Sequence, residues 1–114
     1  MRLMSIVILV ASLAAACSGT ATGSAVRGRM VFTEHCSNCH SLDPGVVIVG
    51  PSLAGVSSRA NSQGSEPRDY LEQAILSPAA EIVTGYSNLM PADFERKLAP
   101  SDLEALLAFL LTLG

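Results

Sequence analysis

Large side chains and positive charges are both scarce in this sequence of 114 residues. It has no tryptophan, and its two tyrosines and three phenylalanines leave a domain of this size with a thin apolar core. Seven Lys and Arg residues stand against ten Asp and Glu, a net charge of −3 at pH 7 that argues against nucleic acid as a partner. Internal repeats are absent as well, so the length predicts a single domain.

Side chains that commonly bind metals are also few, namely three cysteines and two histidines. A structural zinc site normally needs four ligands, often as two closely spaced pairs, and here only Cys36 and Cys39 form such a pair. A thioredoxin-like dithiol uses the same Cys-x-x-Cys spacing, but it requires strands alternating with helices, a pattern that this sequence does not have. Both classes of site are therefore disfavoured.

The cysteine pair belongs to the segment Cys36-Ser37-Asn38-Cys39-His40, which has the spacing of a c-type haem attachment sequence. On one helical turn the two sulfurs point the same way, so each can bond to a vinyl group of one porphyrin while His40 reaches the iron. Two buried cysteines beside a surface histidine would be the purely structural alternative. The segment predicts one covalently bound haem c per chain, and the porphyrin would add the apolar bulk that the few aromatic residues do not supply.

The beginning of the chain has the pattern of an export signal. Met1 and Arg2 are followed by an apolar run over residues 3–16, which predicts a signal peptide over residues 1–16. As a helix this run would span about 21 Å, short of the roughly 30 Å of a bilayer core. Cys17 follows directly and resembles the lipid-carrying cysteine of a bacterial lipoprotein, although Leu13 lies one position too far upstream. Ordinary cleavage that leaves a free Cys17 thiol is the alternative, and either outcome places the protein in the periplasm or on the outer face of the cell membrane.

The domain itself is predicted to span residues 24–114, after a lipid-attachment cysteine and flexible tether over residues 17–23. Ser24 is expected to cap a first helix that runs to the haem motif. Gly28 within this helix suggests a close approach by another element, since glycine there costs about 1 kcal/mol relative to alanine. The side chains expected to face the interior are Val26, Met30, Val31 and Phe32.

Beyond the motif the sequence predicts long loops and two more helices. Residues 46–49 form a β-branched run without a partner strand, expected to be an extended loop packed against apolar groups, and residues 57–65 form a polar loop. A second helix should begin near Pro67 and stop at Pro78. A third should begin at Ser101, with Ser101 and Glu104 as a capping box. Its apolar stripe consists of Leu103, Leu106, Leu107 and Leu110, with Phe109 beside it.

The second axial ligand of the iron is predicted by elimination. The other histidine, His35, lies in the same helix as the motif, and Met30 precedes the motif on the same side of the porphyrin. Two further methionines belong to the signal peptide. Met90, followed by Pro91, lies on a loop long enough to wrap the porphyrin and is the remaining candidate.

Taken in order, these features resemble those of a class I monohaem cytochrome c across residues 24–114. The resemblance includes Gly50-Pro51-Ser52-Leu53-Ala54-Gly55 after the haem motif, and it implies an all-α fold of three main helices and long loops around one haem. It further implies that the Pro51 carbonyl accepts the ring proton of His40, that Leu53 packs on the haem, and that Arg59 meets a propionate. Gly28 and Phe32 would cross the last helix near Phe109.

The resemblance implies a one-electron carrier rather than an enzyme, working in a respiratory or photosynthetic chain with membrane-bound redox complexes or other electron-transfer proteins. With His40 and Met90 both bound, the iron has no open position for a small-molecule substrate. The sequence departs from the family pattern at two places. Residues 46–49 are apolar where mitochondrial relatives have a lysine-bearing loop. Ala74 stands where many relatives have a tyrosine directed at the methionine sulfur, a role that Tyr86 could take instead. A gas-binding or sensor protein with a displaceable sixth ligand is the alternative function.

Overall fold

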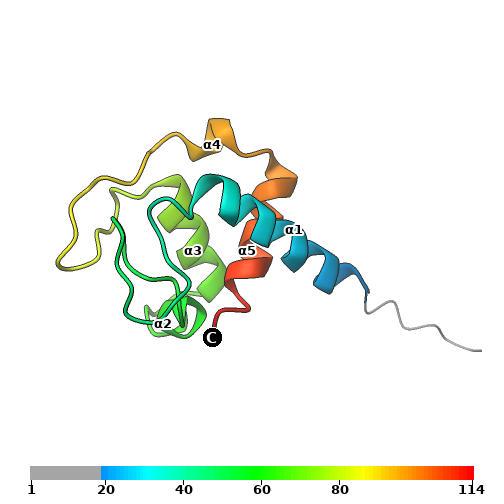
Figure 1. Ribbon diagram of the computed structural model, residues 1–114, viewed down its shortest axis with the longest axis horizontal. Coiled ribbons are helices and arrows are strands. Elements are labelled where there is room, and N and C mark those ends of the chain that lie inside the picture. Colours follow the sequence, from blue (N-terminus) through cyan, green and yellow to red (C-terminus); the bar gives the residue numbers. More distant parts are fainter. Residues whose placement is uncertain (1–18) are drawn as a thin grey trace, which may run out of the picture.

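The computed structural model describes residues 19–114, with side chains from residue 23 onward, and the described part is helical (Figure 1). Within this range the helices are α1 (Gly19–His35), α2 (Val56–Asn61), α3 (Pro67–Leu76), α4 (Phe94–Lys97) and α5 (Pro100–Leu110). The described residues contain no β-strand, only an isolated antiparallel bridge between His40 and Val47. The predicted all-α fold with three main helices and long loops is confirmed, while the predicted signal peptide and Cys17 lie outside the described residues.

The core is centred on the crossing of α1 and α5, the most extensive helix–helix contact of the molecule. Gly28 makes this crossing possible, because a Cβ atom at that position would lie 1.9 Å from the carbonyl oxygen of Ala105. One turn later Phe32 meets Phe109, with ring centroids 5.8 Å apart and planes inclined by 51°. The close approach predicted from the glycine and the crossing near Phe109 are both present.

The first helix differs from the sequence prediction at its start and on one face. It begins at Gly19 rather than after Ser24, so residues 19–23 are helical and not a flexible tether. This segment contains no proline, and extending a helix that already packs on α5 costs far less than nucleating one. Val26 and Met30 do not face the interior and are 61% and 58% exposed. Gly28 faces α5, which turns these two side chains toward solvent.

Helices α3 and α5 both begin at prolines. Pro67 and Pro100 occupy the first positions of α3 and α5, where a proline loses no hydrogen bond. The predicted capping box is wrong, because Ala99 is the N-cap of α5 and no side chain caps this helix. Glu104 instead accepts a hydrogen bond from Arg68 of α3 and so links the two helices. The predicted apolar stripe of α5 is confirmed, with Leu106, Leu107 and Leu110 buried and Leu103 packed at the edge of the core.

Two segments predicted as loops also differ from expectation. The polar run over residues 57–65 contains most of α2, whose Val56 and Ala60 are buried on the core side. Residues 46–49 are a loop, as predicted, but the loop bends at residues 48 and 49, and each of the four residues is between 45% and 57% exposed. None of the described helices is both long and apolar enough to cross a membrane.

Candidate functional site

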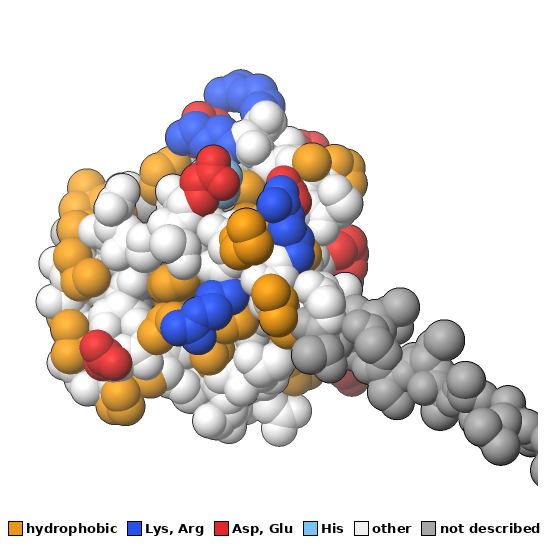
Figure 2. All heavy atoms as spheres, turned by 45° about the vertical axis from the view of Figure 1, so that its right-hand side comes forward, with side chains coloured by type: hydrophobic (Ala, Val, Ile, Leu, Met, Phe, Trp, Pro, Cys, Tyr) orange, Lys and Arg blue, Asp and Glu red, His pale blue; other side chains and the backbone are white. Residues whose placement is uncertain are grey.

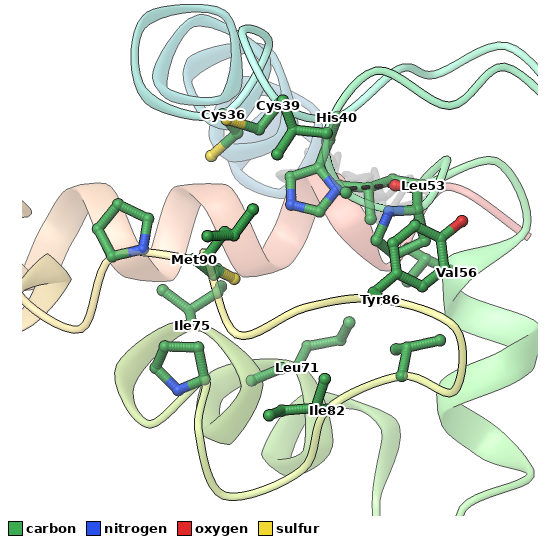
Figure 3. Close-up of a pocket in the computed structure, with 18 of the residues that line it drawn as sticks. Cys36, Cys39, His40, Leu53, Val56, Leu71, Ile75, Ile82, Tyr86 and Met90 are labelled. Carbon is green, nitrogen blue, oxygen red and sulfur yellow. Dashed lines mark hydrogen bonds between the residues drawn. The ribbon is translucent and has the colours of Figure 1, made fainter.

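A cavity of about 260 Å³ lies between the end of α1, helix α3, helix α5 and the two long loops of the molecule (Figure 3). Its wall is mainly apolar and includes Leu71 and Ile75 of α3 and Leu106 and Leu110 of α5. The side chains singled out by the sequence meet here: Cys36, Cys39, His40, Pro51, Leu53, Arg59 and Met90 all line the cavity.

The Cys-x-x-Cys-His segment continues the backbone of α1 as a tight turn. The Cys36 amide donates to the carbonyl of Phe32 at 2.8 Å, and the His40 amide donates to the carbonyl of Cys36 at 2.9 Å. This turn places both sulfurs and the imidazole at one wall of the cavity (Figure 3). Burial and the neighbouring Cys39 raise the pKa of the Cys36 thiol to about 11, so the unattached cysteine remains a protonated thiol at neutral pH.

The ring of His40 is fixed by a hydrogen bond through one of its two nitrogens. Its Nδ1 lies 2.7 Å from the carbonyl oxygen of Pro51, and because a carbonyl only accepts, Nδ1 carries the proton and donates it. In the neutral imidazole this leaves Nε2 without a proton and able to bind a metal. Gly50 allows the loop to come this close, since a Cβ there would lie 2.5 Å from Cε1 of His40.

The loop that carries Pro51 is itself tied down by Arg59 of α2. The guanidinium donates through Nη2 to the carbonyl of Ser52 at 2.8 Å and through Nη1 to the carbonyl of Ala54. The Leu53 amide donates to the carbonyl of Ser41 at 2.8 Å, which joins this loop to the residue after His40. Arg59 therefore holds backbone carbonyls as well as lining the cavity, a role that the sequence did not indicate.

Met90 approaches the cavity from the opposite wall, on the loop between α3 and α4 (Figure 3). His35 lines the cavity from α1, on the same side as the cysteines. Met30, largely exposed on the outer face of α1, is not among the lining residues. Met90 is therefore the methionine that faces His40 across the cavity, and its role as the sixth ligand stays a prediction.

Tyr70, Glu81 and Tyr86 also border the cavity, and the sequence did not single them out as a group. Burial raises the pKa of the Tyr70 phenol, the carboxylate of Glu81 raises it further, and Arg59 opposes the shift. Tyr86 also lines the cavity, as does Ala74, and the role of Tyr86 toward the Met90 sulfur stays a prediction. Glu81 lies in a loop without periodicity, and no pattern could have placed it at the cavity.

The lining fits a flat, largely apolar macrocycle that is attached through two thiols and carries a metal at its centre. Two sulfurs and an imidazole share one wall, a thioether lies on the other, and aliphatic side chains fill the remainder. The described residues contain no group of three or more His, Cys, Asp or Glu side chains that could hold a metal ion by themselves.

The sequence model of the cytochrome c family matches residues 25–114, the part of the chain that builds the cavity. The chain belongs to the cytochrome c family. This cytochrome accordingly binds one covalent haem c with its iron and acts as a haem-based electron carrier, with Cys36 and Cys39 spaced as the family motif requires. Its all-α fold is that of a class I member. None of the curated proteins matches the sequence.

Proposed function

We propose that the cytochrome carries single electrons with His40 and Met90 as the two axial ligands of its iron, in a respiratory or photosynthetic chain. The observation that supports this proposal most directly is that His40 and Met90 approach one cavity from opposite walls. Two strong ligands would leave no position for a substrate, which favours electron transfer over catalysis. The haem supplies an iron that changes by one charge while remaining six-coordinate.

The chain's own residues would set how easily that charge changes. The Pro51 carbonyl accepts the Nδ1 proton of His40, which makes the imidazole a stronger donor and favours the oxidised iron. A thioether from Met90 favours the reduced iron and raises the potential, and burial among Leu71, Ile75 and Leu110 acts in the same direction. Arg59, at the cavity wall, is the cation that we expect to face a haem carboxylate.

The absorption spectrum of the purified holoprotein tests the ligand assignment. The proposal expects low-spin iron with a sulfur-to-iron charge-transfer band. Met90→Ala should lose this band, admit water or carbon monoxide, and lower the potential by more than about 60 mV, a tenfold change in a one-electron equilibrium.

Met30→Leu is the matched control, because Met30 is 58% exposed and the exchange conserves volume. An unchanged spectrum in Met90→Ala would mean that another group is the sixth ligand. High-spin iron that binds carbon monoxide readily in the parent protein would favour the gas-binding alternative instead.

The location of the cytochrome is part of the same proposal. Residues 1–16 are proposed to be a signal peptide and Cys17 to carry lipid, which would hold the protein at the outer face of the cell membrane. Membrane-bound redox complexes are then its partners. The support comes from the sequence, since these residues lie outside the described part of the structure.

A further inference from the structure

Helix α1 presents an apolar stripe to solvent on the face opposite α5. Val26 and Met30 lie one turn apart on this helix and are 61% and 58% exposed. Successive residues of a helix are turned by about 100°, so these two side chains point within about 40° of each other and roughly opposite Gly28. Gly28 faces the Ala105 carbonyl of α5. Helix α5 therefore covers one side of α1 and leaves the stripe on the other side in solvent.

Two arginines flank this stripe, one on each side by the same helical period. Arg27 donates to the carboxylate of Asp102 through Nε at 2.9 Å and Nη2 at 2.8 Å, and its side chain is still 54% exposed. The Arg29 guanidinium lies 5.9 Å from the centre of the Phe109 ring. Figure 2 shows hydrophobic and basic side chains next to each other on the face nearest the N-terminal end of the described chain. Both cations are thus held beside exposed apolar groups.

The charges of the chain are divided unevenly between α1 and the rest. All ten acidic residues lie at Glu34 or beyond it. Residues 19–33 carry two arginines and no acid, whereas residues 34–114 carry four basic against ten acidic side chains, a net charge of −6 with histidine neutral. Asp102 offsets part of the charge of Arg27. An anionic surface would therefore attract α1 and repel most of the remaining molecule, which would turn this helix toward the surface.

The start of α1 lies close to the proposed lipid attachment. The helix begins at Gly19, so only Ser18 stands between it and Cys17 in the sequence. One residue spans at most about 3.6 Å, and a helix rises by about 10 Å from Gly19 to Val26. A lipid on Cys17 would therefore keep the stripe near the bilayer, because the connection is too short to hold α1 away from it.

We propose that the exposed face of α1 lies on a bilayer that contains anionic phospholipids. This α1 membrane face consists of Val26, Arg27, Arg29 and Met30. The two apolar side chains enter the boundary of the hydrocarbon region, while the guanidinium groups meet phosphate oxygens. The inference rests on the location proposed above. Because the cavity lies at the other end of α1, beside Cys36, a helix that lies on the bilayer holds the cavity at a fixed height near membrane-bound partners.

The size and charge of the α1 membrane face favour lipid over protein as its occupant. Two exposed apolar side chains are too few for a stable protein interface, which needs roughly 800 Å² per partner. A bilayer requires no such area, because the acyl chains on Cys17 supply most of the binding and raise the local concentration of the face at the surface. Apolar side chains flanked by arginines also match the order of hydrocarbon and phosphate in a phospholipid layer.

Vesicles test the face without the anchor. The holoprotein of Cys17→Ser should cosediment with vesicles of equal parts phosphatidylglycerol and phosphatidylcholine at least about fivefold more than with pure phosphatidylcholine, and about 500 mM salt should remove the difference. An acidic protein without such a face would instead be repelled by the anionic lipid. No preference for the anionic vesicles would therefore overturn the proposal.

A matched pair of variants places the contact on α1. Val26→Glu should lower binding of the Cys17→Ser holoprotein to the anionic vesicles about tenfold, because it replaces an apolar group by a charge that the lipid repels. Val47→Glu is the control and should lower binding less than about twofold. It makes the same exchange at a side chain that is 57% exposed in the loop after His40. Equal losses in the two variants would show that net charge alone decides binding and would overturn the assignment.

Met30 reports the same contact in the anchored native protein. A water-soluble oxidant converts an exposed methionine to its sulfoxide, which mass spectrometry detects. On anionic vesicles the oxidation of Met30 should be more than about threefold slower than in Cys17→Ser without vesicles, and Val26→Glu should restore the faster rate. An equal rate in solution and on the vesicles would overturn the α1 membrane face while leaving the anchor in place.

Further measurements separate this inference from its neighbours. A reversible one-electron couple and an unchanged spectrum in every variant show that folding and ligation are intact, so a loss of binding concerns the surface alone. An unmodified Cys17 in the native protein would remove the anchor only, because the binding of Cys17→Ser is measured without it. Sedimentation equilibrium that reveals a stable dimer in the parent, dissociated by Val26→Glu, would assign the face to a second copy and overturn the proposal.

Discussion

At the scale of single residues, the turn that places Cys36 and Cys39 at one wall of the cavity has a direct chemical consequence. Thioether bonds to both sulfurs should keep the haem on the polypeptide through denaturing electrophoresis, detected by haem staining. Cys36→Ala or Cys39→Ala should weaken this retention, and the double variant should abolish it. Cys17→Ser is the control and should stain like the parent. Haem released from the parent by acid and organic solvent would contradict covalent attachment.

Two roles of Arg59, supporting the loop and placing a positive charge near the haem, can be separated by experiment. Its guanidinium holds the carbonyls of Ser52 and Ala54, and it is also the cation expected near a haem carboxylate. Arg59→Gln removes a positive charge, which should stabilise the oxidised iron, lower the potential by up to about 60 mV, and alter its pH dependence. Arg59→Lys keeps the charge but cannot span both carbonyls, and its potential should stay near that of the parent.

Potentiometry from pH 5 to pH 9 measures the reduction potential of both variants. Arg68→Lys is the control, because Arg68 forms ion pairs with Glu72 and Glu104 and does not line the cavity. If Arg59→Gln matches the parent at every pH, the guanidinium only supports the loop. If both Arg59 variants shift alike, the lost contact with the carbonyls is responsible rather than the lost charge, because only the Gln variant is neutral.

At the scale of helices, the α1–α5 crossing depends on one absent side chain. Gly28→Ala would force a Cβ against the Ala105 carbonyl and the Cβ of Phe109, at distances of 1.9 Å and 2.7 Å. The helices must separate, so the free energy of unfolding should fall by about 1–3 kcal/mol or more. Gly23→Ala is the control, with nothing within 4 Å of its added carbon, and should be neutral or stabilising by up to about 1 kcal/mol. Denaturant titration of the holoprotein followed by circular dichroism measures both.

The helices also show how far sequence reasoning reaches. Long elements with clear stops were predictable, as with α3 between Pro67 and Leu76, and the cavity residues Cys36, His40 and Met90 could be found from spacing and elimination. The capping box failed because Pro100 starts α5 one residue before Ser101. Helix α2 was missed because six residues are too few for a periodic pattern.

A different reason explains why the sequence did not predict the buried face of α1 or the position of Glu81. Val26 and Met30 have the apolar character of core residues, but the face that packs is decided by where Gly28 meets α5. Glu81 reaches the cavity through the path of a loop. Both depend on tertiary contacts rather than on local pattern, and local pattern is all that a single sequence offers.

At the scale of the whole molecule, the question is how the domain meets its partners. The described residues contain no helix long and apolar enough to cross a membrane, and residues 44–55 and 82–92, in the two loops beside the cavity, carry no lysine or other charged side chain. Such a surface gives little long-range steering, because steering requires charge. Confinement near a membrane would compensate by raising the local concentration of any redox complex in the same layer.

Cys17 is the residue on which this confinement would depend. More than one acyl chain at a lipoprotein cysteine anchors a protein stably, whereas a single chain binds only marginally. The native cytochrome should therefore fractionate with membranes, resist a high-salt wash and be released by detergent. Cys17→Ser should be soluble outside the cytoplasm with the spectrum of the parent, because residue 17 lies outside the matched range of residues 25–114. Native protein found wholly in the soluble fraction, with an unmodified Cys17 by mass spectrometry, would leave a freely diffusing carrier that meets its partners by diffusion alone.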